Sequence, residues 1–199
     1  MRVGIVLPQG YFNEFDGWDP TKAWDRILEL AVKAEELGFE ALWTGEHVLA
    51  KWPGEATAFD CWTLSSALAA VVPRVDIGLI VVNSTFHHPA MLAKRAATLD
   101  SIADGRVTLG LGAGFKENEA KAFGYPYPTL NERMEMLTEH FEIIWRAQAM
   151  PASEMRHDKD STMNFWPCAS NTWYSWKPLG SRAPKVACFF ARSAPNHWM

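Results

Sequence analysis

The residues from 85 to 115 join an amphipathic helix directly to a short apolar strand that ends in a glycine-rich turn. The apolar residues of the helix recur at the spacing of one buried face: Met91, Leu92, Ala96, Leu99 and Ile102. Residues 107–111 are predicted to form a buried strand, and Gly112 and Gly114 allow the backbone to turn sharply or to approach a ligand closely. The spacing of these glycines lacks the full dinucleotide-binding fingerprint, so it is compatible with an ordinary strand-to-helix turn.

The same order of elements repeats along the first three quarters of the chain. Further strands are predicted over residues 3–7, 39–43 and 75–82, and further helices over residues 20–37, 60–72 and 130–145. Asp19 followed by Pro20 is typical of a helix start, and Thr129 with Glu132 forms a capping box. We therefore expect four consecutive βα units with parallel strands in the order 1-2-3-4. Both an open doubly wound sheet and a (β/α)₈ barrel fit this pattern.

Five segments carry a resemblance to a known family. They read VGIVLPQG, GFEALWTGEHV, RVDIGLIVVNSTFHHPAMLAKRAATLD, ADGRVTLGLGAGFKENEAKAFGYPYP and NERMEMLTEHFEIIW. Over residues 1–148 the chain resembles the luciferase-like monooxygenase family, and most closely its deazaflavin-dependent branch. The resemblance implies an α/β fold, the first half of a (β/α)₈ TIM-type barrel. It also implies an oxidoreductase or monooxygenase that uses FMN or coenzyme F420 on a small-molecule substrate.

In such barrels the chemistry lies at the C-terminal ends of the strands. His47 follows the second strand, and an imidazole there suits proton transfer, so we expect it to be catalytic. The alternative is a loop histidine bonded to a carboxylate such as Glu46. The resemblance implies cofactor contacts from six residues: Ile80, Val81, Val82, Asn83, Gly112 and Gly114. It also implies substrate contacts from three residues: Gln9, Glu46 and Phe115.

The resemblance further implies a non-prolyl cis peptide bond at the end of the third strand, at Ile80–Val81 or Val81–Val82. His87 and His88 are expected mainly to shape a turn. No Cys/His spacing typical of a metal site is recognisable, so we predict no metal. Ala113 stands where luciferases that emit light carry an arginine, and Phe115 stands where sugar-phosphate dehydrogenases carry a glutamate. Both departures argue against those two reactions.

Residues 149–199 have a different character. From residue 161 onward the chain has no Asp or Glu and shows no apolar periodicity. We expect an irregular tail with neither a fifth strand nor phosphate-binding loops, and therefore weak cofactor binding, if any, and negligible turnover. Three interpretations stay open: a segment read out of frame or from an altered gene end, a divergent folded extension, and an aromatic, basic interaction segment. The alternative to an enzyme is a catalytically inactive truncated half-barrel, either stable only through self-association or unstable altogether. The first of these cases predicts a homo-oligomer.

The composition of the chain indicates which partners and which cellular compartment to expect. Residues 1–150 hold 13 Lys and Arg against 20 Asp and Glu, which argues against a nucleic-acid partner. Three widely spaced cysteines predict a reducing cytoplasm without a disulfide framework. We find neither a signal peptide nor an apolar run long enough for a membrane span, so no membrane partner is expected.

Overall fold

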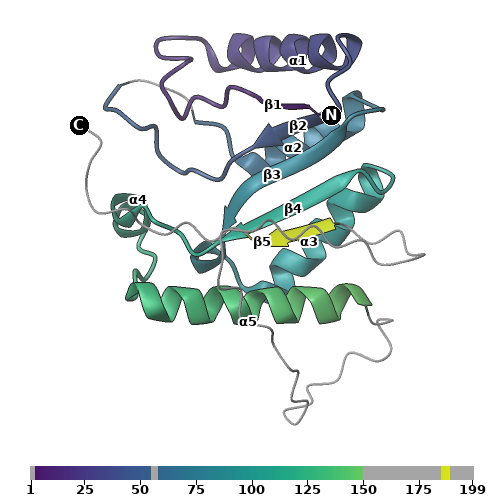
Figure 1. Ribbon diagram of the computed structural model, residues 1–199. Helices are drawn as coiled ribbons and strands as arrows, with labels where there is room; N and C mark the ends of the chain where they lie inside the picture. The colour runs from purple at the N-terminus through teal and green to yellow at the C-terminus, as the bar shows by residue number, and fades with distance from the viewer. Residues whose placement is uncertain (1–2, 55–57, 150–184, 189–199) are drawn as a thin grey trace.

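The computed structural model describes residues 3–54, 58–149 and 185–188. Its strands are β1 (Gly4–Val6), β2 (Ala41–Thr44), β3 (Asp76–Asn83), β4 (Val107–Gly112) and β5 (Lys185–Cys188). Its helices are α1 (Pro20–Glu36), α2 (Cys61–Val71), the 3₁₀ turn η1 (Ser84–Phe86), α3 (Pro89–Ile102), α4 (Glu117–Ala122) and α5 (Leu130–Ala149). All strands pair in parallel in the order β1-β2-β3-β4-β5, which confirms the predicted order of the first four (Figure 1).

Helices α1, α2 and α5 begin within one residue of their predicted starts, whereas the short helix α4 is not among the predictions. The Asp19 carboxylate accepts hydrogen bonds from the backbone N–H groups of Thr21 and Lys22, at 2.9 and 3.2 Å, and so caps α1. At α5 the Thr129 N–H donates to Glu132 at 2.8 Å, which is one arm of the predicted capping box. None of the helices in the described ranges is long and apolar enough to cross a membrane.

The core lies between the sheet and the helices that cover its outer face. Figure 1 shows α2 and α3 behind the strands, with α1 on the β1 side of the sheet and α5 on the β5 side. The largest fully buried side chains of this layer include Ile27, Leu42, Leu68, Ile77, Leu79, Leu92, Leu99, Leu109, Leu111, Leu137 and Ile144. Burial of this apolar area is the main source of the fold's stability.

The prediction that Met91 and Ile102 share the buried face of α3 is wrong. Their side chains are 56% and 49% exposed. The residues of α3 that pack inward include Leu92, Ala96 and Leu99. A helix turns by about 100° per residue, so the side chain one position before or after an inward-facing residue points away from the core.

The other face of the sheet, which does not carry the helices, is crossed by one indole ring. Trp43 alternates with Leu42, which is in the core, and therefore points to this second face. A Cβ atom placed on Gly4 or on Gly78, in the strands on either side of β2, would overlap the ring of Trp43. The two glycines thus give the indole space to lie across three strands.

The expectation that the tail contains no fifth strand is also wrong. Strand β5 pairs in parallel with β4, and its register sets Lys185 against Thr108 and Cys188 against Leu111. Only Val186 in this four-residue strand is β-branched, so the segment leaves too short a pattern to predict. The other residues after 149 lie outside the described ranges, so the boundary at residue 148 and the three interpretations of the tail stay predictions.

Candidate active site

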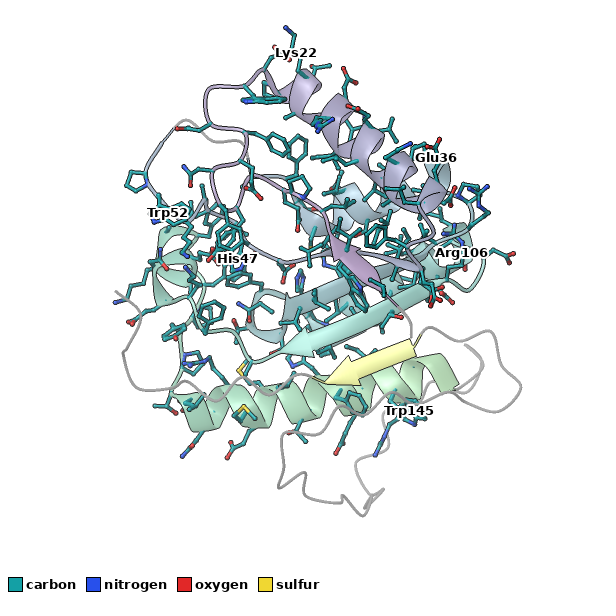
Figure 2. All side chains as sticks on the ribbon, turned by 45° about the horizontal axis from the view of Figure 1, so that its top comes forward. Lys22, Glu36, His47, Trp52, Arg106 and Trp145 are labelled. Carbon is teal, nitrogen blue, oxygen red and sulfur yellow. The ribbon has the colours of Figure 1, made fainter. Side chains whose placement is uncertain are left out.

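The loops that follow β1, β2, β3 and β4 lie at the same edge of the sheet, the one formed by the C-terminal ends of the strands, because the strands are parallel. Asn83 and Gly112 are register partners at the ends of β3 and β4. The loop after β2 reaches them through the carboxylate of Glu46, which accepts a hydrogen bond from the Asn83 N–H at 2.7 Å. Figure 2 shows His47 and Trp52 at the arrowhead end of the strands and Arg106 at the opposite end.

At this edge His47 is held by two partners from distant parts of the chain. Its Nδ1 atom lies 3.0 Å from Oε1 of Glu119, in α4. The Glu119 side chain is 3% exposed and that of His47 is 21% exposed. The ring of Tyr11 stacks on the imidazole with 3.6 Å between centroids and 12° between planes. The arrangement fixes both the position and the orientation of the imidazole.

The pairing with Glu119 decides which nitrogen of neutral His47 carries the proton. An ionised carboxylate only accepts hydrogen bonds, so Nδ1 is the donor and carries hydrogen. Nε2 is then the basic nitrogen, and the histidine retains part of its surface for a ligand. Sequence analysis missed Glu119, because α4 is only six residues long and follows His47 by a long stretch of chain.

Glu46 lies inside the structure. One oxygen of its carboxylate accepts from Asn83, and the other lies 2.7 Å from Nε2 of His87. Arg95 donates to Nδ1 of His87 at 3.2 Å, so Nε2 carries the proton that is given to Glu46. The Glu46 side chain is 5% exposed. The geometry favours a role in positioning β3 over the substrate contact that the sequence predicts for Glu46.

The thiol of Cys61 also approaches this carboxylate. Its Sγ atom lies 3.8 Å from Oε1 of Glu46, at the first position of α2. Burial, followed by the nearby charges of Glu46 and Asp60, raises the pKa of the Cys61 thiol well above its ordinary value. Cys61 is therefore a protonated donor within a buried network at neutral pH, and not a nucleophile.

Gln9 also makes internal contacts where the sequence predicts substrate contact. Its Oε1 atom accepts from the Gly45 N–H at 2.6 Å, and its Nε2 donates to the Gly45 carbonyl at 3.2 Å. This pair of bonds extends the pairing of β1 and β2 beyond the strands themselves. It holds the start of the loop that carries Glu46 and His47, so the geometry favours a positioning role for Gln9 as well.

The end of β3 departs from regular strand geometry at the residues that the sequence predicts as cofactor contacts. The peptide bond between Ile80 and Val81 is cis, at one of the two positions that the resemblance implies. The register with β4 shifts between Leu79 and Val82. A Cβ atom on Gly112 would lie 2.6 Å from Cγ2 of Val81, so only glycine allows this close approach.

Asn83 and Gly114 complete this edge. The Oδ1 atom of Asn83 accepts from the N–H and the hydroxyl of Thr85, at 3.1 and 2.9 Å. Gly114 has a φ of 72°, and a Cβ there would overlap the Asn83 amide. Val82 and Gly112 are buried, which leaves Ile80, Val81, Asn83 and Gly114 as the partly exposed members of the predicted set.

Phe115 lies beside His47. The two rings are 6.1 Å apart and nearly perpendicular, and the Phe115 side chain is 63% exposed. Substrate contact by Phe115 stays a prediction. Within the described residues, no group of three or more His, Cys, Asp or Glu is arranged to hold a metal ion.

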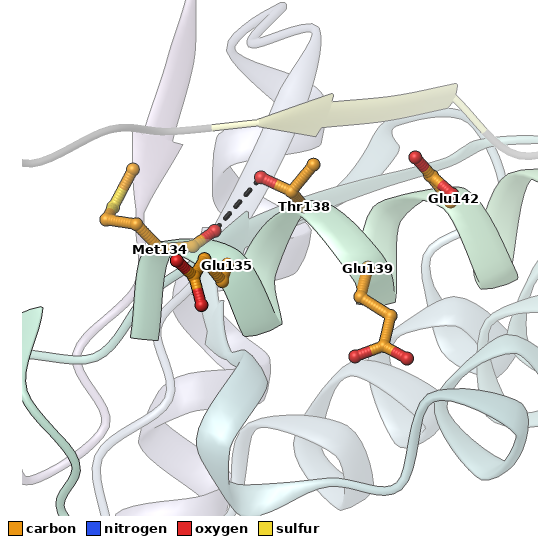
Figure 3. A pocket seen from close by; sticks show the side chains of 5 residues that line it. All are labelled: Met134, Glu135, Thr138, Glu139 and Glu142. Atoms are coloured by element: carbon orange, nitrogen blue, oxygen red, sulfur yellow. Dashed lines mark hydrogen bonds between the residues drawn. The ribbon is translucent and has the colours of Figure 1, made fainter. Parts of the chain in front are cut away.

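A separate hollow of about 400 Å³ runs along α5 (Figure 3). It is lined by Met134, Glu135, Thr138, Glu139 and Glu142. The Thr138 hydroxyl donates to the Met134 carbonyl one turn earlier, at 3.0 Å, so it is already bonded. None of the predicted site residues lines this hollow, and its carboxylates are exposed at Glu135 and Glu139 and partly exposed at Glu142.

Comparison with known proteins identifies the family. Residues 1–164 match the luciferase-like monooxygenase family, which is most of the chain. This chain belongs to the luciferase-like monooxygenase family. The F420-dependent glucose-6-phosphate dehydrogenase of Amycolatopsis mediterranei is 36% identical over 142 residues, which are 70% of this chain and 41% of that enzyme. The chain thus spans about two fifths of this curated relative.

Solved structures of luciferase-like enzymes share the fold. Monooxygenase RslO1 from Streptomyces bottropensis superposes with a TM-score of 0.58 at 30% identity, over 75% of this chain and 44% of that one. The oxygenating constituent of 3,6-diketocamphane monooxygenase of Pseudomonas putida, solved with FMN, gives a TM-score of 0.60 at 24% identity, over 72% and 38%. These neighbours are TIM-barrel enzymes, so the parallel sheet of this chain corresponds to part of a (β/α)₈ barrel.

Proposed function

We propose that this chain supplies the proton-transfer and ring-side parts of an active site that uses FMN or coenzyme F420 to oxidise or reduce a small organic molecule. The observation that carries the proposal is the pairing of His47 with buried Glu119 at the strand ends, beside the cis bond of β3. F420 and FMN are the cofactors of relatives named above. When bound, such a cofactor supplies the hydride or electron chemistry.

His47 is the group that moves the proton. With Nδ1 donating to Glu119, its Nε2 atom takes a proton from a substrate hydroxyl or returns one to a developing oxyanion. The charge of Glu119 stabilises the imidazolium that forms on proton uptake, at a distance of 3.0 Å. Tyr11 keeps the ring in its plane, so the imidazole does not reorient between the two steps.

The residues at the ends of β3 and β4 fit the face of a flat heterocycle. Ile80 and Val81 offer partly exposed apolar side chains, and Gly112 lets Val81 approach β4 closely. These residues, with Asn83 and Gly114, would hold the ring. Glu46, Gln9 and the Asn83–Thr85 turn would keep this surface in place through the bonds described above.

The partner we propose is a small-molecule substrate, as for the relatives. Phe115 places an apolar ring beside His47, where an acidic group is expected in sugar-phosphate dehydrogenases, so we propose a substrate other than a sugar phosphate. A homo-oligomer and a cytoplasmic location stay predictions. A catalytically inactive half-barrel stays the alternative.

The test uses the full chain and the variant His47→Gln, with His88→Gln as the matched control because His88 is exposed and its side chain does not cap α3. FMN and F420 binding are measured by fluorescence quenching. Turnover is measured as F420 reduction by a panel of alcohols and, with reduced FMN and O₂ supplied, as formation of the oxygenated product from a panel of ketones. We expect His47→Gln to retain cofactor affinity and to lose activity by about 10²- to 10⁴-fold, whereas His88→Gln is unchanged. A His47→Gln variant with wild-type turnover would contradict the proposal, and failure of the wild-type chain to bind either cofactor would favour the inactive half-barrel.

A further inference from the structure

A group of aromatic rings with two lysines lies next to His47, and the proton-transfer step uses only one of its members, Tyr11, which holds the imidazole in place. We call it the aromatic–lysine cluster, and it consists of Tyr11, Phe12, Trp52, Phe115, Lys51 and Lys116. Its members come from three loops, which follow β1, β2 and β4. They are therefore gathered by the fold, at the edge where parallel-barrel enzymes bind their substrates.

The large rings of the cluster are open to solvent. Phe12, Trp52 and Phe115 are 54%, 51% and 63% exposed. Phe12 lies 6.2 Å from Trp52 between ring centroids, and 4.7 Å from Tyr11. Single exposed aromatic residues are common on protein surfaces, whereas neighbouring ones that expose this much area indicate a binding surface.

Both lysines place their charge over these rings. The Nζ atom of Lys51 lies 5.0 Å from the Phe12 centroid and 4.7 Å from that of Trp52. Lys116 Nζ lies 5.3 Å from the Tyr11 ring and 5.6 Å from the Phe115 ring. In the part of the chain that the structure describes, neither ammonium has a carboxylate partner. The cluster thus combines flat apolar surfaces with two ammonium groups that contact aromatic rings.

The cluster is continuous with His47. Tyr11 stacks on the imidazole, and the Phe115 ring lies nearly perpendicular to it. A ligand that stacks in the cluster would therefore lie close to the His47 ring. The chemistry that fits is a planar aromatic ring with one anionic substituent, because each ring face finds an aromatic partner and the anion finds an ammonium.

We infer that the aromatic–lysine cluster is the substrate subsite and that it selects planar aromatic anions, such as aromatic carboxylates. The inference rests on the proposed function, because the ligand is called a substrate only on the ground that the subsite adjoins the proposed proton-transfer residue. It differs from the ring-holding surface of β3 and β4, whose residues are not members of the cluster.

Isothermal titration of the full chain with 2-naphthoate tests the inference. Two further probes separate the two requirements: 2-naphthalenemethanol keeps the ring without the charge, and cyclohexanecarboxylate keeps the charge without the aromatic ring. We expect 2-naphthoate to bind about tenfold more tightly than either, because each loses one class of contact. Equal affinities for the three probes, or no binding of 2-naphthoate, would overturn the inference.

Variants identify the residues. We expect Trp52→Ala and Lys116→Gln each to weaken 2-naphthoate binding by about tenfold. The matched controls are Trp18→Ala and Lys22→Gln, an exposed tryptophan and an exposed lysine outside the cluster, and both should leave the affinity unchanged. A loss in the controls equal to that in the cluster variants would indicate non-specific binding and overturn the inference.

A competition arm separates substrate from cofactor, since FMN is itself a planar aromatic anion. Retention of 2-naphthoate binding in excess FMN supports a separate subsite, whereas displacement of 2-naphthoate assigns the cluster to the cofactor and overturns the inference. If cofactor binds and 2-naphthoate does not, the proposed function stands and this inference fails. If 2-naphthoate binds and neither FMN nor F420 does, the subsite stands and the proposed function fails.

Discussion

The Nδ1 atom of His47 lies 3.0 Å from the Oε1 atom of Glu119, although 72 residues separate them in the sequence. The pairing connects the loop after β2 with the short helix α4 after β4. It places a buried carboxylate, only 3% exposed, against a histidine that retains surface for a ligand. Because the carboxylate accepts the hydrogen bond, the proton of neutral His47 lies on Nδ1, and the ring is the Nδ1–H tautomer.

The first prediction concerns that tautomer. Replacing Glu119 with Leu removes the acceptor and introduces an apolar side chain of similar size at this buried position. We expect the His47 ring to change from the Nδ1–H form to a mixture dominated by Nε2–H, because nothing then stabilises the proton on Nδ1. Long-range ¹H–¹⁵N correlation spectra report the two forms. The signal is assigned with His47→Gln, and Glu117→Gln, an exposed position of the same helix, is the control. An unchanged Nδ1–H signal in Glu119→Leu would show that the pairing does not set the tautomer.

The second prediction concerns Glu46. Replacing it with Leu leaves the Asn83 N–H and the His87 ring without their acceptor at a position that is 5% exposed. We expect the free energy of unfolding to fall by about 2–6 kcal/mol, since each of the two buried unsatisfied donors costs about 1–3 kcal/mol. Urea denaturation measures it. Glu29→Leu removes a carboxylate whose side chain is 68% exposed in its pair with Arg26, and it should change the stability by less than about 1 kcal/mol. Equal losses in the two variants would contradict a positioning role for Glu46.

The third prediction concerns the indole that crosses the sheet. A methyl group at Gly78 would overlap the ring of Trp43, so Gly78→Ala should destabilise the chain by about 1–3 kcal/mol. In the background Trp43→Leu, which removes the overlapping ring, the same change should cost much less. Urea denaturation of both single variants and the double variant gives the loss in free energy of unfolding that Gly78→Ala causes in each background. Additive losses would show that Gly78 and Trp43 do not interact.

Much of the scaffold could be predicted because local signals determine it. Asp19 and the pair of Thr129 and Glu132 mark helix starts through bonds to backbone a few residues away, and the structure has those bonds. Apolar strands of four to eight residues leave a recognisable pattern. Strand β5 does not, since its four residues include Lys185 and Ala187. Position on a helix face is also harder to predict, as exposed Met91 shows, because one residue of error rotates a side chain by about 100°.

The candidate site was predictable only in part, for a different reason. The ends of parallel strands follow from the order of elements, so His47 and Asn83 were expected at one edge. The partners that determine their chemistry are non-local. Glu119 meets His47, and Gln9 meets Gly45, only because the sheet is assembled. No spacing in the sequence separates a carboxylate that binds a histidine from one that is solvated.

The last prediction concerns pH and Cys61. Burial, with the charges of Glu46 and Asp60, raises the pKa of this thiol in the folded chain well above its ordinary value. In the unfolded chain the thiol ionises near pH 8.5, so above that pH the unfolded state loses a proton that the folded state keeps. The stability that depends on Cys61 is therefore fully present below about pH 8.5 and is lost as the pH rises toward the folded pKa, by at most about 1.4 kcal/mol per pH unit.

The variant Cys61→Ala isolates this contribution, because the other ionisable groups are common to both chains. The free energy of unfolding is measured by urea denaturation at intervals from pH 7 to pH 10.5, and the difference between wild type and variant is plotted against pH. We expect a constant difference up to about pH 8.5 and a decline above it, since alanine has no proton to lose. A difference that stays constant through the alkaline range would mean that the thiol ionises equally in both states, and the raised pKa would be wrong.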